Sequence, residues 1–310
     1  MKIAVFNVLN MGMRKVNNEF VCENLIKIVS RYSVVVMLEV KDQKGEAMKT
    51  FLSKLNSDGG NRSHPYSMMC SKPLGRSSYK EKFVFFYRED EAKVVDSFQY
   101  EEEDEDVLAR EPFILHFSFP NTAVQELVLI PVHSKPEDAA IELNALDDVV
   151  DAVKKRWNNK VYQNIMILGD FNADGRYLSK KNKAESRLCS ADYHWLIDDD
   201  VDTTTSNLND HTYDRIVVHG KTLLNGVVPG SAKSFNFQTA FNLKDKDAQR
   251  ISDHYPVEVE LKNLQRPRAP KRKRTASPKG QKRGQQKKKN LTGARKSGPS
   301  SNTPAKRTHF

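Results

Sequence analysis

The stretch MILGDFNADGR at residues 166–176 carries a run of apolar and small residues directly into Asp170, Phe171 and Asn172. The run indicates a buried β-strand that ends at these residues. For a single strand, the simplest interpretation of a terminal Asp or Asn is a turn, because both side chains hydrogen-bond to nearby backbone. Whether Asp170 has a chemical role therefore depends on what ends the other strands.

Eight runs in the sequence have the composition of β-strands, and two segments have helical periodicity. The predicted strands are residues 2–8, 33–40, 82–88, 113–119, 127–133, 164–170, 214–220 and 255–261. The predicted helices are marked by the spacing of Phe20, Val21, Leu25, Ile28 and Val29, and of Ile141, Ala145, Leu146, Val149, Val153 and Trp157. Several strands are apolar on both faces, so helices or a second sheet must cover them. The sequence therefore predicts one layered α/β domain over residues 1–262.

Polar residues recur at or beside the ends of the predicted strands. They are Asn7, Glu39, His133, Asp170, Asp214 and the triplet Ser252, Asp253 and His254. If these ends meet at one rim, the site contains acids, amides and two imidazoles. Carboxylates held close together repel each other, and a hard divalent cation with oxygen ligands relieves that repulsion. Cysteine is absent from the set, which favours Mg²⁺, Mn²⁺ or Ca²⁺ over zinc.

Two histidines in one site suit an in-line displacement. One group takes a proton from water while another gives a proton to the leaving oxygen. Imidazole can do either near neutral pH, because its unperturbed pKa is about 6.5. Hydrolysis of a phosphate ester fits these residue types best.

The formal charge of +10 is unevenly distributed along the chain. Residues 263–310 contain 16 Lys or Arg and no acid, whereas residues 1–262 contain 34 basic and 40 acidic residues, a net charge of −6. The basic segment has almost nothing to bury, so we expect a disordered tail. Two clusters in it resemble nuclear-import signals and would attract polyanions: KRKR from Lys271 to Arg274, and KKK at 287–289. A solubilising appendage is the alternative interpretation.

Several classes of protein are disfavoured by composition. No apolar run approaches the roughly 18 residues of a membrane span, so we expect no membrane segment. Strand-like alternation begins at residue 2, so we expect either synthesis without a secretory leader or a processed form. Cys22, Cys70 and Cys189 are odd in number and widely spaced, which predicts free thiols in a reducing compartment. We therefore expect an intracellular protein, nuclear rather than cytoplasmic, with an import receptor as partner.

Longer stretches of the sequence carry a family resemblance. They are KIAVFNV, LEVKD, LGRSSYKEKFVFFYR, AREPF, LIPVHSKPEDA, ILGDFNADGRY, TYDRIVVHG and ISDHYPVEVEL, in this order. Over residues 1–262 the chain resembles the deoxyribonuclease I family, and more specifically its deoxyribonuclease-I-like and deoxyribonuclease γ branches. GDFN and SDH alone specify only the wider endonuclease/exonuclease/phosphatase superfamily. YKE, REP and TYDRIV narrow the resemblance to the deoxyribonuclease I group.

The resemblance implies a four-layer sandwich of two packed β-sheets with helices outside. It implies a monomeric endonuclease that needs Mg²⁺ or Mn²⁺, cleaves DNA with little sequence specificity and leaves 5′-phosphate and 3′-hydroxyl ends. Matched residue by residue, Glu39 would bind the catalytic metal with help from Asn7, Asp170 and Asp253. His133 would pair with Glu81, His254 would pair with Asp214, and Asn172 would hold the scissile phosphate. Which histidine is the base and which the acid stays open.

The resemblance also implies contacts with DNA and with structural ions. Lys41, Tyr79, Arg110 and Tyr213 lie at positions that the family uses against the DNA backbone and minor groove. Asp202 and Thr204 resemble a structural Ca²⁺ loop of the family. The acidic stretch at 100–106 falls where the family can hold another Ca²⁺, and a solvated loop is the alternative interpretation. Gly175 and His211 occupy the places where secreted members of the family have a disulfide, so that cross-link is expected to be absent.

Two other classes of function stay open at this stage. A phosphoesterase of the same superfamily acting on lipid or inositol phosphates would share GDFN and SDH, although YKE and REP argue against it. A catalytically silent chromatin-binding protein could keep the fold and bind DNA through the basic tail. The presence of both acid-imidazole pairs favours the enzyme, although a fold alone does not establish activity.

Overall fold

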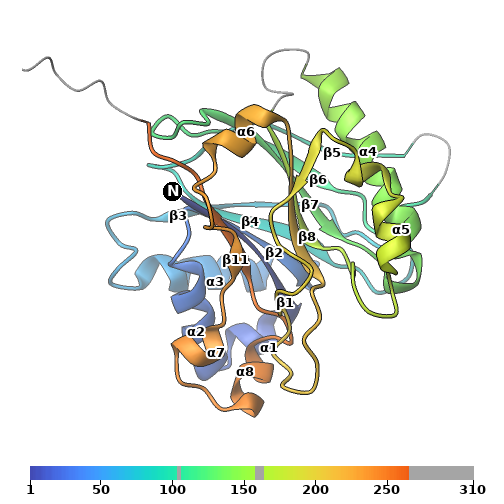
Figure 1. Ribbon diagram of the computed structural model, residues 1–310. Helices are drawn as coiled ribbons and strands as arrows, with labels where there is room; N and C mark the ends of the chain where they lie inside the picture. Colours follow the sequence, from blue (N-terminus) through green and yellow to red (C-terminus); the bar gives the residue numbers. More distant parts are fainter. Residues whose placement is uncertain (103–105, 158–163, 265–310) are drawn as a thin grey trace, which may run out of the picture. The chain divides into compact units, whose positions relative to one another are not determined.

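The computed structural model describes residues 1–102, 106–157 and 164–264. In these residues, twelve strands form two six-stranded sheets (Figure 1). The order in the first sheet is β11 (Lys233–Ser234), β12 (Val257–Glu260), β1 (Lys2–Met11), β2 (Val34–Val40), β4 (Lys82–Arg88) and β3 (Tyr66–Cys70). The order in the second sheet is β5 (Lys93–Gln99), β6 (Phe113–Ser118), β7 (Glu126–His133), β8 (Ile165–Asp170), β10 (Asp214–His219) and β9 (Tyr193–Trp195).

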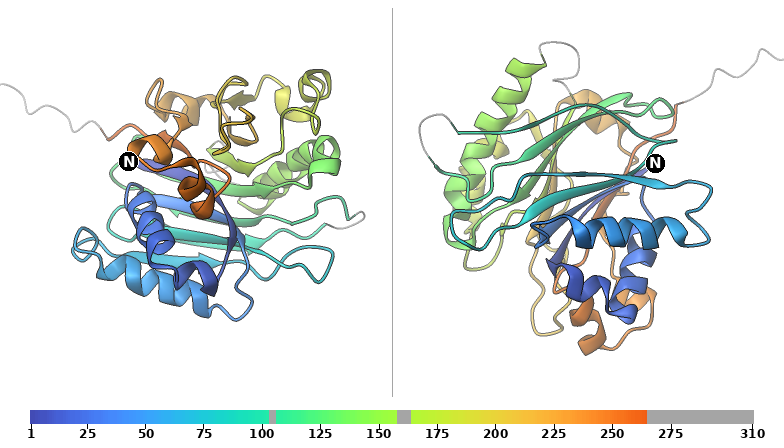
Figure 2. Two further views of the ribbon diagram at one scale, coloured as in Figure 1. Left: turned by 90° about the horizontal axis from the view of Figure 1, so that it is seen from below. Right: turned by 180° about the vertical axis from the view of Figure 1, so that it is seen from behind.

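Helices cover the outer faces of both sheets (Figure 2). The helices on the first sheet are α1 (Met13–Val16), α2 (Glu19–Val29), α3 (Glu46–Ser57), α7 (Phe237–Ala240) and α8 (Asp245–Ile251). The second sheet is covered mainly by α4 (Ala139–Arg156). Shorter helical segments are α5 (Lys180–Ala184), α6 (Lys221–Gly226), η1 (Pro136–Asp138) and η3 (Arg187–Cys189). The predicted four-layer sandwich is therefore confirmed.

Alternate residues of one strand are buried in different cores. In β1, Ile3 and Val5 face the second sheet, whereas Ala4 and Phe6 face the helices. In β8, Met166 and Leu168 lie between the sheets, and Ile165 and Ile167 lie under α4. A strand that is buried on both faces needs apolar residues at consecutive positions. This explains why the interior strands read as continuous apolar runs.

All eight predicted strands are present, within two or three residues at their ends. The four strands that the sequence did not predict, β3, β5, β9 and β11, are the edge strands of the two sheets. They are short or mixed in polarity, because an edge strand is covered less completely than an interior one. The prediction for the face of α4 was wrong at Ile141, which is 63% exposed, and Leu143 is buried instead. The acids and lysines that surround these apolar positions blur the helical period.

The described body continues slightly past the predicted boundary at residue 262. Asn263 pairs with Thr122, and the N–H of Leu264 donates to Asn121 O at 2.8 Å. The rest of the predicted tail, including both basic clusters, lies outside the described residues. Cys22, Cys70 and Cys189 are free thiols, as predicted. Among the described helices, none combines the length and apolarity needed to cross a bilayer.

Candidate active site

The register of the second sheet brings three predicted site residues into one row. β7 and β8 run parallel with His133 opposite Asp170. β10 runs antiparallel to β8 with Asp214 also opposite Asp170. Facing residues in neighbouring strands lie about 5 Å apart. The strand ends that look unrelated in the sequence therefore meet at one rim.

Gly169 allows this close meeting of the strands. Its φ is +156°, and a Cβ built on it would lie 1.9 Å from Val132 O, in the neighbouring strand β7. No side chain fits in that space, because ordinary contacts begin near 3.4 Å. The glycine before Asp170 thus lets β7 and β8 pair up to their last residues, His133 and Asp170.

The first sheet contributes Asn7 from β1 and Glu39 from β2. The Asn7 Nδ2 donates to Glu39 Oε1 and to Asp170 Oδ2, each at 3.2 Å. The Asn7 Oδ1 accepts the N–H of Leu9 at 3.1 Å, so the amide presents its N–H groups to the two acids. Asn7 therefore connects an acid of the first sheet to an acid of the second sheet at this rim.

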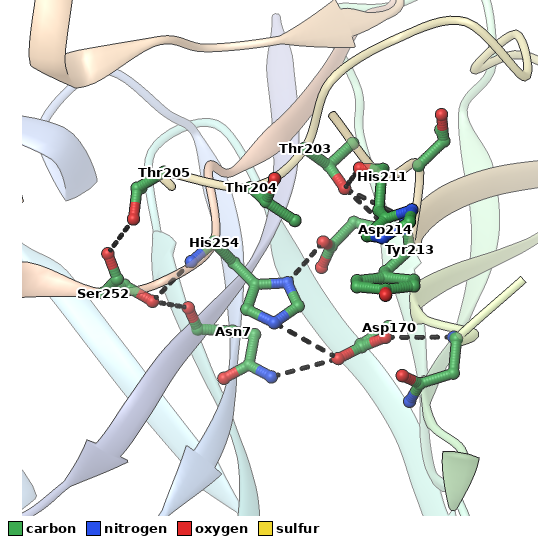
Figure 3. A network of polar contacts seen from close by, with 12 residues as sticks. Asn7, Asp170, Thr203, Thr204, Thr205, His211, Tyr213, Asp214, Ser252 and His254 are labelled. Atoms are coloured by element: carbon green, nitrogen blue, oxygen red, sulfur yellow. Dashed lines mark hydrogen bonds and ion pairs between the residues drawn. The ribbon is translucent and has the colours of Figure 1, made fainter. Parts of the chain in front are cut away.

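Each histidine is paired with a carboxylate through Nδ1 (Figure 3 shows the His254 half). His254 Nδ1 lies 2.6 Å from Asp214 Oδ2, and His133 Nδ1 is hydrogen-bonded to Glu81 Oε1. The Nε2 atoms of the two rings approach the same atom, Asp170 Oδ2, at 3.7 Å for His254 and 3.8 Å for His133. Both acid-imidazole pairs expected from the resemblance are thus present, with Nε2 of each ring directed at Asp170.

The carboxylates change the proton affinity of the rings. Burial alone would lower the pKa of His254, but Asp214 and Asp170 outweigh it and hold that pKa well above its ordinary value. Burial also opposes the charged form of His133, and Glu81 outweighs it to raise the pKa. A raised pKa means that each ring retains a proton more readily than a free imidazole does.

Among the predicted substrate contacts, Arg110 is engaged inside the site. Its Nε lies 2.9 Å from Glu81 Oε1, and its Nη1 donates to His133 O at 3.3 Å. The guanidinium therefore compensates the Glu81 charge next to the ring of His133. Tyr79 is 48% exposed on the surface, and Lys41 Nζ lies 3.3 Å from the centre of its ring. Tyr213 lies beside His254, with ring centres 6.2 Å apart.

The acids of the site form a donor set that suits a hard divalent cation. Glu39 Oε1 and Asp170 Oδ2 approach the same Asn7 amide, and the Glu39 side chain is 17% exposed. Ligand atoms of Asp170, Asp214 and His254 lie within 4.8 Å of one another, but Asp214 is occupied by the His254 ring. Asp253 is exposed next to His254. Oxygen donors without cysteine are typical of Mg²⁺ and Mn²⁺ sites, so Glu39 and Asp170, with Asp253 nearby, fit such an ion.

Asn172 lies in a tight loop after β8. Its φ is 47°, its N–H donates to Asp170 Oδ1 at 3.0 Å, and its Nδ2 donates to Ser134 O at 2.9 Å. An amide NH₂ has two N–H donors, so one is accounted for by Ser134. The loop thus holds the amide of Asn172 beside the strand end that carries His133.

Two threonines on either side of Thr204, neither of them predicted as a site residue, support the catalytic rim. Thr203 Oγ1 accepts the N–H of Tyr213 at 3.0 Å and of Asp214 at 3.2 Å. Thr205 Oγ1 donates to Ser252 O, and Ser252 Oγ donates to Asn7 O at 2.6 Å (Figure 3). The run of three threonines at 203–205 was the available signal. The side chains predicted for the ion, Asp202 and Thr204, hydrogen-bond each other at 2.9 Å, and a calcium role stays a prediction.

The loop after β8 is connected to the segment before β10 without a disulfide. Asp174 Oδ2 accepts the N–H of Thr212 at 2.9 Å, and His211 Nδ1 lies 3.3 Å from the same oxygen. A Cβ on Gly175 would lie 3.0 Å from the His211 ring, so the two positions without cysteine are neighbours. Arg215, only 1% exposed, donates to Thr212 O at 2.9 Å and to Ala173 O at 3.2 Å. Nothing in the local sequence indicates the role of this buried arginine.

A second buried acid lies behind Arg110. Glu142 of α4 is 2% exposed, and its Oε1 accepts the N–H of Lys135 at 3.0 Å. Burial raises its pKa to about 7, although hydrogen bonds from the backbone of Lys135 and Ala109 favour the charged form. Glu142 thus holds together the segment after His133, through Lys135, and the segment before Arg110, through Ala109.

The acidic stretch at 100–106 lies partly outside the described residues, and its Glu101 pairs with Lys72 at 2.8 Å.

Comparisons with known proteins show what this chain is similar to. Residues 4–254 match the model of the Endonuclease/Exonuclease/phosphatase family. Deoxyribonuclease-1 of Oryctolagus cuniculus is 42% identical over 266 residues, covering 84% of this chain and 92% of the relative. Deoxyribonuclease-1-like 1 of Homo sapiens is 43% identical, covering 84% of each. The solved catalytic domain of human Nocturnin, with 13% identity, covers 85% of this chain and 94% of that domain with a TM-score of 0.58, a likeness of fold alone.

Proposed function

Because the chain belongs to the endonuclease/exonuclease/phosphatase family and, within it, to the deoxyribonuclease I family, we propose that it is a deoxyribonuclease. In this proposal it is an endonuclease that hydrolyses phosphodiester bonds of DNA with a divalent metal ion. One observation carries the mechanism: Nε2 atoms of two carboxylate-paired histidines lie 3.7 and 3.8 Å from the same oxygen, Asp170 Oδ2. A phosphate bound beside Asp170 would lie close to both rings. One imidazole would take a proton from the attacking water, and the other would give a proton to the leaving oxygen.

Glu39, Asp170 and Asp253 would hold Mg²⁺ or Mn²⁺, and Asn7 would keep the first two in place through its N–H groups. The ion would supply positive charge to a phosphate that the acids alone would repel. The protein contributes the geometry, because Glu39 and Asp170 come from different sheets and are joined by one amide. Without an ion, bringing a phosphate to these acids would be unfavourable.

The two imidazoles would move the protons. In each ring the carboxylate at Nδ1 fixes the tautomer, so that Nε2 is the atom that exchanges a proton with water or with the leaving oxygen. The leaving oxygen accepts a proton from one ring as the P–O bond breaks, while the attacking water gives a proton to the other. Attack at phosphorus with departure of the 3′-oxygen leaves a 5′-phosphate and a 3′-hydroxyl.

Asn172 and Arg110 would position the phosphate. The second N–H of the Asn172 amide can donate to a phosphate oxygen without adding negative charge. Arg110 is paired with Glu81 through Nε and donates to His133 O through Nη1, so its other N–H groups would donate to a phosphate oxygen. Both residues come from loops that directly follow or precede the strands of the second sheet.

DNA would be recognised by its shape. The exposed Tyr79 packs against the half-buried Lys41, an arrangement that suits contact with sugars and the minor groove, and Tyr213 lies beside His254. These contacts do not read base edges in the major groove, so little sequence specificity is expected. The body carries a net charge of −6, and the 16 basic residues at 263–310 would supply most of the attraction to the polyanion.

The products of a duplex oligonucleotide test the proposed reaction. We expect the full chain with Mg²⁺ to produce 5′-phosphorylated fragments with extendable 3′-hydroxyl ends, and His133→Gln to reduce the rate at least 100-fold, on the order of a lost acid or base. Inositol phosphates and phosphoinositide vesicles serve as competing substrates. Release of phosphate from these with intact DNA would favour the phosphoesterase, and binding of DNA without any cleavage would favour the silent chromatin protein.

The proposed location is the nucleus, and it rests on the sequence of the tail. KRKR from Lys271 to Arg274 would bind an import receptor. Replacing these four residues by alanine in a tagged chain should move the protein from nucleus to cytoplasm. A matched change of KKK at 287–289 shows whether that cluster contributes. An unchanged distribution of both variants would exclude import through these clusters.

A further inference from the structure

Glu39 lies in the most irregular part of the first sheet. The regular register between β1 and β2 is lost between Asn7 and Met11, next to Glu39. Leu9, Asn10 and Glu39 have φ values of 43°, 56° and 54°. Left-handed backbone at residues other than glycine costs free energy and persists only where surrounding contacts maintain it. The contacts that maintain it here therefore have consequences for the position of Glu39.

Two asparagines of β1 hold the two oxygens of Glu39. Asn7 Nδ2 donates to Oε1 at 3.2 Å, and the backbone N–H of Asn10 donates to Oε2 at 3.1 Å. Asn7 is buried, whereas Asn10 is exposed. The orientation of the carboxylate thus depends on one contact inside the protein and one at its surface.

The surface contact continues to Tyr79. The hydroxyl of Tyr79 donates to Asn10 Oδ1 at 2.8 Å, and Lys41 Nζ lies 3.3 Å from the centre of the tyrosine ring. Asn10 therefore contacts the exposed tyrosine with its side chain and Glu39 with its backbone. Asn10 is thus the one residue between Tyr79, which would contact DNA, and the Glu39 carboxylate, which would bind the metal ion.

We propose that Asn10 is a positioning residue that couples Tyr79 to Glu39, so that DNA on the tyrosine steadies the metal-binding carboxylate. The inference rests on the proposed function, which places DNA at Tyr79 and the ion at Glu39. The hydrogen bond from Tyr79 holds Asn10 in the left-handed conformation that directs its N–H at Glu39 Oε2. DNA packed on the ring limits the motion of that hydroxyl. By linkage, the ion also favours the arrangement of Tyr79 that binds DNA.

Two substitutions break the same hydrogen bond from its two ends. Asn10→Gly removes Oδ1 but keeps the N–H and tolerates the positive φ. Tyr79→Phe removes the hydroxyl but keeps the ring under Lys41. Ser77→Ala is the matched control, because Ser77 Oγ accepts the N–H of Tyr79 at 3.1 Å and does not contact Asn10. The control changes the same loop without touching the coupling.

Binding of Mn²⁺ to the full chain, followed by electron paramagnetic resonance without DNA, is the first readout. We expect Asn10→Gly and Tyr79→Phe each to weaken Mn²⁺ binding about three- to tenfold, the effect of one lost hydrogen bond. The double variant should be no weaker than either single variant, since both remove one interaction. Ser77→Ala should bind Mn²⁺ like the wild type.

A phosphorothioate duplex that resists cleavage provides the second readout. It should tighten Mn²⁺ binding in the wild type and in Ser77→Ala more than in Tyr79→Phe. Unchanged Mn²⁺ binding in both single variants, or losses that add in the double variant, would overturn the coupling. If the wild type cleaves no DNA but the Mn²⁺ losses occur as expected, the coupling holds and the proposed substrate fails.

Discussion

We expect Gly169→Ala to destabilise the fold strongly, because the methyl group that it adds would meet the backbone of the neighbouring strand β7. The added Cβ would lie 1.9 Å from Val132 O, about 1.5 Å short of the ordinary 3.4 Å contact, at a φ of +156°. The backbone strain costs about 1–3 kcal/mol, and forcing the strands apart costs about 1–3 kcal/mol more. The free energy of unfolding should therefore fall by about 4 kcal/mol, a large part of a typical total of roughly 5–15 kcal/mol.

Equilibrium unfolding in urea measures this loss, with Gly230→Ala as the matched control. Gly230 has a φ of +70° but no atom within 4 Å of an added Cβ, so only backbone strain of about 1–2 kcal/mol applies. DNA cleavage by Gly169→Ala should also fall, because β7 and β8 can no longer bring His133 next to Asp170. Equal losses of unfolding free energy in the two variants would refute the argument from close strand approach.

Three further predictions concern the acid behind Arg110, the missing cross-link and the tail. The pKa of Glu142 is about 7 in the folded chain against an ordinary 4.5, so folding favours its protonated form, and stability should fall by up to roughly 3 kcal/mol from pH 4.5 to 7. Glu142→Gln should lack this part of the pH dependence in urea titrations, and parallel curves for both chains would contradict it. Gly175→Cys with His211→Cys should form a disulfide on oxidation and raise the free energy of unfolding by about 2–4 kcal/mol, whereas a reduced pair after oxidation would place the two positions too far apart. Truncation after Leu264 removes all 16 basic residues of the tail and should weaken DNA binding and flatten its salt dependence, while an unchanged salt slope would mean that the body alone holds the DNA.

The interior of the fold could be predicted from the sequence because interior strands are apolar on both faces. β2 and β4 are continuous apolar runs, and these were recognised within two residues. β11 has two residues and β9 has three, which is too little for a periodic pattern. α3 alternates apolar residues with lysine and threonine, so its buried residues, Ala47, Met48, Phe51 and Leu55, do not form an obvious run.

The site residues that could be predicted are polar residues at the ends of apolar strands. Their arrangement, and the residues that depend on strand register or on contacts distant in sequence, could not be predicted. Asp170, His133 and Asp214 could be proposed from strand ends, but only the pairing of β7, β8 and β10 places them together. Asn10 depends on an irregular stretch of β1 that local sequence does not reveal. Arg215 looks like an ordinary charged residue in a strand, because its partners, backbone carbonyls such as Thr212 O and Ala173 O and the carboxylate of Asp199, are brought close only by folding.

Nicking of a supercoiled plasmid by the purified full chain tests the central claim most directly. With Mg²⁺ the chain should convert the plasmid to open circles, EDTA should stop the conversion, and His254→Gln, checked for unchanged stability by urea unfolding, should reduce it at least 100-fold, in line with a lost acid or base. Plasmid that stays supercoiled with Mg²⁺ and with Mn²⁺, or nicking that persists in His254→Gln, would contradict the account.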